Sequence, residues 1–87
     1  MWRYAKESVR RKILARDLSD ELVERTLMEP DFVMASRANR FIAQKLYSKP
    51  GLNELLIRVV YEEVNGEKAV VTAYLARPER YVGGQLM

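Results

Sequence analysis

The sequence predicts an α+β domain in which two N-terminal helices pack on a three- to four-stranded antiparallel β-sheet. Two observations support this fold class. Apolar residues recur at three- or four-residue spacing as far as Pro30, and from Asp31 onward they alternate with polar residues as in strands. The later runs are separated by Pro50-Gly51 and Asn65-Gly66, which are typical hairpin-turn dipeptides. The helices are therefore expected first and the sheet second.

The length and composition indicate a single folded domain. The chain has 87 residues, of which 48% are apolar and 31% are charged, a balance typical of folded soluble domains. A chain of this length buries too little surface for two hydrophobic cores. We expect one α+β domain over residues 1–82 and a flexible C-terminal tail over residues 83–87, which begins with two glycines.

The residue types that are absent narrow the chemistry. The sequence has no Cys and no His, which excludes disulfides, a cysteine nucleophile and the commonest general base and zinc ligand. It has no glycine-rich phosphate loop, and we expect no cofactor and no metal site. It has no apolar run long enough to cross a bilayer and no secretory signal pattern, so we expect a cytoplasmic protein without a membrane partner.

The net charge of +3 conceals blocks of opposite sign. The charge is +4 over residues 1–18, −4 over residues 19–36 and +4 over residues 37–49. Such blocks have two interpretations, namely solvated faces that pair inside the molecule, or a basic surface that binds a polyanion. Net charge alone does not decide between them.

The first predicted helix spans residues 2–16. A row of Ser8, Lys12 and Arg16, spaced by four residues, borders its apolar stripe, so its cations can reach into a cleft. Other basic side chains of this helix point further out and are expected to serve solubility. The apolar stripe comprises Trp2, Ala5, Val9 and Ile13, and the outward cations are Lys6, Arg10 and Arg11.

The second predicted helix begins after Ser19 and ends near Pro30. Ser19 is the expected N-cap, because acidic residues follow it in the first turn, where the helix dipole favours negative charge. Leu18 and Val23 have the spacing of a hydrophobic staple.

Four alternating runs then predict a meander of strands over residues 32–34, 40–47, 55–64 and 67–75. Asn65-Gly66 favours a two-residue type I′ turn, which places Val64 opposite Glu67 and Tyr61 opposite Val70. The same register places Val59 opposite Thr72 and Ile57 opposite Tyr74.

Both faces of the predicted sheet are largely apolar, and a two-helix layer covers only one of them. We therefore expect the second face to form a homodimer or to bind a protein partner. The first face carries Leu55, Ile57, Val59, Tyr61, Val70, Thr72 and Tyr74. The second face carries Leu56, Arg58, Val60, Val71, Ala73 and Leu75, with Leu56, Val60, Val71 or Leu75 expected in the contact.

Residues 8–19 read Ser-Val-Arg-Arg-Lys-Ile-Leu-Ala-Arg-Asp-Leu-Ser and resemble the opening of the family called domain of unknown function 4258. That opening typically has His-Ala, a basic residue four positions after the His, another four beyond, and then Gly-Ile-Ser. The resemblance continues through Glu29-Pro30-Asp31, a strand over residues 37–44, residues 56–60 and residues 70–74, so it covers roughly residues 5–81.

The resemblance implies a fold like that of small ribonuclease toxins of the RelE and BrnT kind. In those proteins an N-terminal helix pair leans on an antiparallel sheet, and basic residues contact RNA phosphates. The chain departs from the pattern where Ser8 replaces the usual His and Asp17 replaces the common Gly. Because serine alone is not a general base near neutral pH, any catalysis would depend on electrostatic stabilisation by Arg and Lys.

The resemblance also implies candidate site residues. The candidate catalytic residues are Ser8, Lys12, Arg16, Arg58 and Thr72. The candidate nucleic-acid-binding residues are Lys12, Arg16, Lys45 and Arg58, together with Arg40, which could extend the basic row, and Tyr81, which could stack on a base. Each has a structural alternative. Lys12 and Arg16 can pair with carboxylates of the second helix, Arg58 can be a satisfied structural cation or an interface residue, and Thr72 is ordinary in a strand.

Three functional interpretations remain open. The first is a small RelE- or BrnT-like RNA-interacting protein, a toxin-related ribonuclease with weakened or lost catalysis. The second is a non-catalytic RNA-binding or ribosome-associated module. The third is an interaction domain that forms a homodimer or binds an antitoxin-like chain. The missing His favours the second and third over a full ribonuclease.

Overall fold

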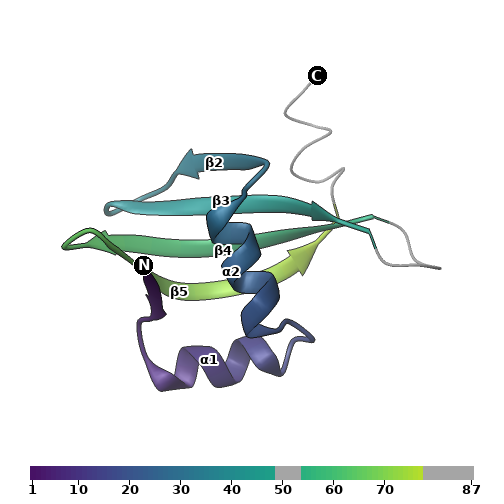
Figure 1. Ribbon diagram of the computed structural model, residues 1–87, viewed down its shortest axis with the longest axis horizontal. Coiled ribbons are helices and arrows are strands. Elements are labelled where there is room, and N and C mark those ends of the chain that lie inside the picture. Colours follow the sequence, from purple (N-terminus) through teal and green to yellow (C-terminus); the bar gives the residue numbers. More distant parts are fainter. Residues whose placement is uncertain (49–53, 78–87) are drawn as a thin grey trace.

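The computed structural model describes residues 1–48 and 54–77, which form two helices and one five-stranded mixed sheet (Figure 1). The sheet order is β1-β5-β4-β3-β2, and all neighbours are antiparallel except β1, which runs parallel to β5. The predicted Pro50-Gly51 turn and the predicted tail lie outside the described residues. In chain order the elements are β1 (Trp2–Tyr4), α1 (Glu7–Leu14), α2 (Asp20–Met28), β2 (Phe32–Ala35), β3 (Arg40–Tyr47), β4 (Leu55–Val64) and β5 (Glu67–Ala76).

The prediction of a first helix over residues 2–16 is wrong at its start, because Trp2–Tyr4 form a strand. The backbone N–H of Ala5 donates to the carbonyl of Val70 at 2.8 Å, which ties this segment to β5. The rings of Trp2 and Tyr4, two residues apart, lie edge to face with centroids 5.0 Å apart. Pairing with the open edge of β5 thus overrides the helical spacing, and the predicted three- to four-stranded antiparallel sheet gains a fifth, parallel strand.

The second helix agrees with its prediction. Ser19 has an extended backbone, and its Oγ accepts a hydrogen bond from the Leu22 N–H at 3.1 Å. This bond satisfies one of the N–H groups that have no partner within the first helical turn. Leu18 and Val23 are both buried in one core cluster, as the staple pattern predicts.

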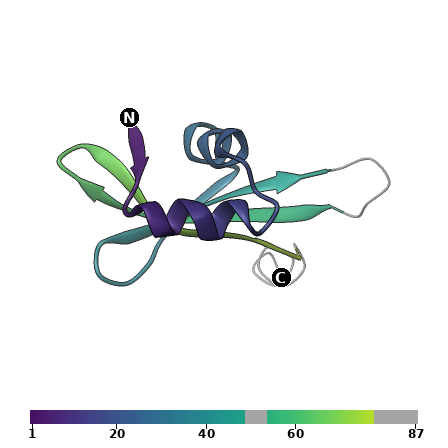
Figure 2. The same ribbon diagram turned by 90° about the horizontal axis from the view of Figure 1, so that it is seen from below.

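The two helices lie differently against the sheet (Figures 1 and 2). α2 crosses one face over β3 and β4, whereas α1 runs along the side of the sheet where β5 and β1 lie. The core formed by the described residues therefore sits between α2 and the sheet and is closed from the β5 side by α1. It comprises Ile13, Leu18, Val23, Leu27, Ala43, Ile57, Val59, Tyr61, Val70 and Ala73.

The predicted hairpin register holds near the turn and shifts by one residue beyond it. Val64 lies opposite Glu67 and Tyr61 opposite Val70, as predicted, but Ile57 lies opposite Leu75. A bulge between Val60 and Tyr61 causes the shift, and Val71 is the extra residue on β5. The bulge lets the core take Ala73 and Leu75 in place of Thr72 and Tyr74, so that their hydroxyl groups are not buried there without partners.

This shift, together with the burial of Leu56 on β4, corrects the predicted protein-binding face. Leu75 packs against the core, and Leu56, which lies outside the core cluster, is fully buried. The expected contact residues Leu56 and Leu75 are therefore not an exposed surface. Exposed apolar side chains instead lie along β2, where Phe32 and Met34 are each 37% exposed and Val33 is 51% exposed.

The β4–β5 turn provides a stability prediction. Asn65 and Gly66 have φ angles of 51° and 81°, the two positive values that a type I′ turn needs. A Cβ at Gly66 would meet no atom within 4 Å, so any cost of a side chain there comes from the backbone. We expect Gly66→Val to lower the free energy of unfolding by more than about 1 kcal/mol, since β-branched residues resist positive φ. Gly66→Asn should lose clearly less in the same urea titration, because Asn tolerates this conformation. Equal losses would show that the turn conformation is not the cause.

Candidate nucleic-acid interface

The predicted row of Ser8, Lys12 and Arg16 persists although α1 is shorter than expected. Ser8 and Lys12 are exposed on α1, and Arg16 lies two residues beyond its end. The Arg16 N–H donates to the Ile13 carbonyl at 3.0 Å, so the chain completes one more tight turn before Asp17 reverses it with a φ of 62°. Asp is one of the few residues other than Gly that adopt this left-handed conformation, because its short polar side chain can hydrogen-bond locally.

Arg16 and Thr72 are brought together at the open edge of β5. The Arg16 Nη1 donates to the Thr72 Oγ1 at 3.3 Å and to the Ala73 carbonyl at 3.1 Å. β1 pairs only with residues 68–70 of β5, so Arg16 contacts the strand where β1 no longer covers it. Both partners are neutral, which leaves the positive charge of Arg16 uncompensated at this contact.

The alternative in which Lys12 and Arg16 pair with carboxylates of the second helix is wrong. In the part of the chain that the structure describes, three ion pairs form, and neither residue takes part in them. Arg10, which was expected to be solvated, makes the contact with α2. The three pairs are Arg3–Glu67 at 3.4 Å, Arg10–Asp20 at 2.9 Å and Arg40–Glu62 at 2.9 Å.

A network centred on Asp20 holds α1 in place. The Tyr4 hydroxyl donates to Asp20 Oδ1 at 2.6 Å, and Arg10 donates to both carboxylate oxygens, at 3.3 and 2.9 Å. The bonds from Arg10 and Tyr4 lower the pKa of Asp20, whereas burial and the bond to Asp20 raise the pKa of the Tyr4 hydroxyl. Because the network joins β1, α1 and α2, it sets the position of the basic row on α1.

The network predicts a pH dependence of stability. The folded-state pKa of Asp20 lies below the unfolded value of about 3.9, so its carboxylate stabilises the fold above that pH. This stabilisation is lost as the pH falls through the lowered pKa. Asp20→Asn should therefore reduce the free energy of unfolding at pH 7 by only about 1 kcal/mol, because solvent screens this half-exposed pair. The same change should flatten the decline of the free energy of unfolding toward acid pH.

The matched control for this measurement is Glu21→Gln. Glu21 is an exposed carboxylate in the same first turn of α2, and it bonds neither Arg10 nor Tyr4. Denaturant titrations of both variants between about pH 2 and pH 7 compare the two carboxylates under the same helix dipole. An equally flat profile for Glu21→Gln would contradict a specific role of the Asp20 network.

Arg58 does not join the α1 row. It is only 6% exposed, and its strand neighbours Ile57 and Val59 face the core, so by alternation Arg58 lies on the other sheet face, paired with the buried Gln44. Its Nε donates to Gln44 Oε1 at 3.1 Å and its Nη1 to the Tyr74 hydroxyl at 2.8 Å, and the guanidinium lies 5.6 Å from the centre of the Tyr74 ring. This placement favours the interpretation of Arg58 as a satisfied structural cation.

The other predicted cations also serve local contacts. Arg40 pairs with Glu62 across β3 and β4. Lys45 donates to the carbonyl of Glu29, the C-cap of α2, at 2.8 Å, where the helix dipole favours a positive charge. Both belong to β3, which packs against α2, β2 and β4, whereas α1 packs mainly against β5 and β1, so they do not extend the α1 row. Tyr81 lies outside the described residues.

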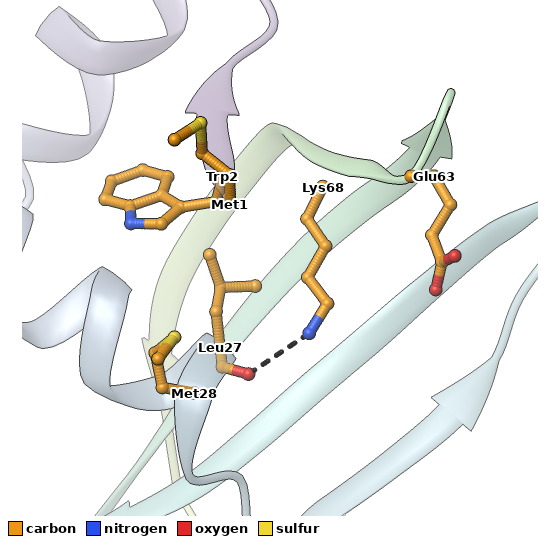
Figure 3. A pocket seen from close by; sticks show the side chains of 7 residues that line it. Met1, Trp2, Leu27, Met28, Glu63 and Lys68 are labelled. Carbon is orange, nitrogen blue, oxygen red and sulfur yellow. Dashed lines mark hydrogen bonds between the residues drawn. The ribbon is translucent and has the colours of Figure 1, made fainter.

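A small open pocket, which no sequence pattern indicated, lies beside the end of α2 (Figure 3). Its volume is about 90 Å³, room for a few water molecules but not for a nucleotide. Lys68 lines it and donates to the Leu27 carbonyl at 3.4 Å. Neighbouring Tyr61 has a pKa raised by burial and, secondarily, by Glu63. The lining residues, which come from segments distant in sequence, are Met1, Trp2, Leu27, Met28, Glu63, Gly66 and Lys68.

The comparisons with known proteins give no relative. No family model matches the chain, and neither a curated protein nor a solved structure matches it. Neither helix in the described ranges is long and apolar enough to cross a membrane. Residues 1–48 and 54–77 also contain no group of three or more Asp or Glu side chains placed to hold a metal ion.

Proposed function

We propose that this chain is a small RNA-interacting protein of the RelE- and BrnT-like kind, which binds single-stranded RNA through α1 and has little or no ribonuclease activity. The observation that carries the proposal is the row of Lys12 and Arg16. The two cations follow one another by one turn, are exposed, and have no carboxylate partner among the described residues. One turn is about 5.4 Å of rise, a spacing that allows contact with successive phosphates of a flexible strand.

Two hydroxyl groups extend this basic row. Ser8 lies one turn before Lys12 on the exposed side of α1, and Thr72 lies at Arg16. Both can donate a hydrogen bond to a phosphate oxygen, and neither carries charge, so they orient a backbone that the cations attract. The row would contact phosphates and not base edges, so we expect the affinity to depend only weakly on RNA sequence.

The proposal of little or no cleavage follows from the absence of a suitable base. The sequence has no His and no Cys. The pKa values that depart clearly from their ordinary range among the described residues move away from neutrality: those of Tyr4, Tyr61 and Arg10 rise, and that of Asp20 falls. A general base works best with a pKa near the operating pH, and histidine, the residue that most often supplies one, is absent from the sequence.

The test measures the affinity of the wild-type protein for a fluorescently labelled single-stranded RNA. Fluorescence anisotropy gives this affinity at salt concentrations between about 25 and 200 mM. Affinity should be weak, in the micromolar range or above, and its logarithm should fall linearly with the logarithm of salt. A parallel gel should show intact RNA for the wild type, with any cleavage appearing only for Ser8→His. Absence of salt-dependent binding at the lowest ionic strength would overturn the proposal.

A further inference from the structure

The outer edge of β2 is exposed along its whole length. β2 is the outermost strand of the sheet (Figure 1), and all of its residues, Phe32–Ala35, are exposed. Three of them are large apolar residues, and none is charged or proline. Proteins usually protect a sheet edge with lysine, proline or a covering segment. Along β2 none of these protections is found within the described part of the chain.

The hydrogen-bonding pattern shows which groups this edge presents. The Ser36 N–H donates to the Arg40 carbonyl at 2.7 Å, which marks Ser36 as a residue whose backbone faces β3. In an antiparallel pair, facing and outward residues alternate, so Val33 and Ala35 direct their N–H and C=O groups away from β3. No hydrogen bond from the described residues reaches these outward groups.

The opposite edge of the sheet is partly covered by other residues of the chain. There β1 pairs with the first part of β5, and Arg16 donates to the Ala73 carbonyl further along. The chain thus covers part of the β5 edge with β1 and with Arg16, whereas β2 keeps four outward backbone groups, two from Val33 and two from Ala35, without a partner among the described residues. A strand that adds to this edge would satisfy all of them.

We propose that the occupant of this edge is a second copy of the chain, with the two β2 strands antiparallel about a two-fold axis that passes beside Met34. In this register Val33 of one copy exchanges hydrogen bonds with Ala35 of the other, so every outward group is used. Asp31 and Arg37, which flank β2 and are both exposed, then come to the same ends of the paired strands, Asp31 of one copy near Arg37 of the other. The Asp31 carboxylate also accepts from the Leu46 N–H at 2.8 Å, a neutral partner that leaves its charge available to the arginine.

Charge complementarity selects this arrangement over the alternatives. An acidic residue precedes β2 and a basic residue follows it, so an antiparallel pair brings opposite charges together at both ends. A parallel pair would place Asp31 beside Asp31 and Arg37 beside Arg37, which repels. The dimer leaves α1 free, because α1 lies along the opposite edge of the sheet, next to β5 and β1. The inference therefore does not rest on RNA binding.

The first test measures oligomeric state by sedimentation velocity across micromolar to millimolar concentration. The wild type should reach twice its chain mass of 10.1 kDa. Val33→Lys should raise the dimer dissociation constant at least about tenfold, since a lysine blunts an edge strand. Val64→Lys is the matched control, because Val64 is a similarly exposed strand valine (38% against 51%) on β4, and it should leave the dimer intact. Circular dichroism verifies that both variants fold.

The second test determines the register of the two β2 strands by disulfide cross-linking. A single introduced cysteine can pair only with its own copy in the second chain, because the native sequence has no Cys. Met34→Cys should give a disulfide-linked dimer under mild oxidation, since residues facing across the two-fold axis have Cα atoms about 4.5 Å apart. Val33→Cys should not, because its two copies are offset by two residues. A wild type that stays monomeric at millimolar concentration, a dimer insensitive to Val33→Lys, or cross-linking of both or neither cysteine variant would overturn the proposed dimer.

Discussion

Replacing Arg58 with alanine is expected to lower the free energy of unfolding by about 3 kcal/mol. The guanidinium is almost fully buried, and its removal takes away the donors to Gln44 Oε1 and to the Tyr74 hydroxyl. Gln44 is itself only 2% exposed, so its carbonyl oxygen would lose a partner with little access to water. A buried acceptor left without a donor costs about 1 to 3 kcal/mol, and the vacated volume adds a packing loss.

Urea unfolding followed by circular dichroism measures this effect, and Arg40→Ala is the matched control. Arg40 belongs to the same sheet and makes one ion pair with Glu62, but its side chain is 47% exposed. An exposed pair contributes between zero and about 1 kcal/mol, so the control should lose much less than Arg58→Ala. Similar small losses for both variants would contradict the structural role of Arg58 and return it to the candidate RNA-binding residues.

The second large effect is expected for RNA binding. The double variant Lys12→Ala/Arg16→Ala should reduce affinity for single-stranded RNA by about tenfold or more at low salt, because two phosphate contacts are lost. The slope of log affinity against log salt should become shallower by about 1.4, since each contact on a single strand contributes about 0.7. Fluorescence anisotropy over a salt series gives both quantities from one set of titrations.

The matched control for the double variant is Arg25→Ala/Arg77→Ala. Both residues are exposed, neither enters an ion pair with a described residue, and the double change removes the same net charge. The variant at Arg16 also loses bonds to Thr72 and Ala73, so its folding must be verified by urea titration. Equal weakening by the two double variants would show diffuse attraction by net charge and would refute the α1 row as the binding site.

Features that depend on neighbouring residues were predictable. The four antiparallel strands begin and end within about two residues of their predicted positions, because alternation and turn dipeptides are local patterns. The Ser19 cap and the positive φ angles at Asn65 and Gly66 follow from the chemistry of those residues in the same way. The row of Lys12 and Arg16 follows from four-residue spacing and survives the shortening of the helix.

Features that depend on contacts with distant residues were not predictable from the sequence. Trp2 fits a helical stripe with Val9, yet it belongs to a strand because β5 offers an open edge to pair with. The bulge at Val60 and Tyr61 leaves no local signal, but it exchanges which residues of β5 face the core. Arg10 and Lys12 are similar in sequence context, and only the folded position of Asp20 makes one of them an ion-pair partner.

The amino-acid sequence by itself determined the α+β class, the hairpins and a basic row on the first helix, because spacing and turn chemistry act over a few residues. The tertiary structure decided which of the cations are free, which sheet face is buried and which sheet edge stays open. Those outcomes depend on contacts between segments far apart in the sequence, such as Arg16 with Ala73, which lies 57 residues away, and the energies of these contacts exist only once the sheet has assembled.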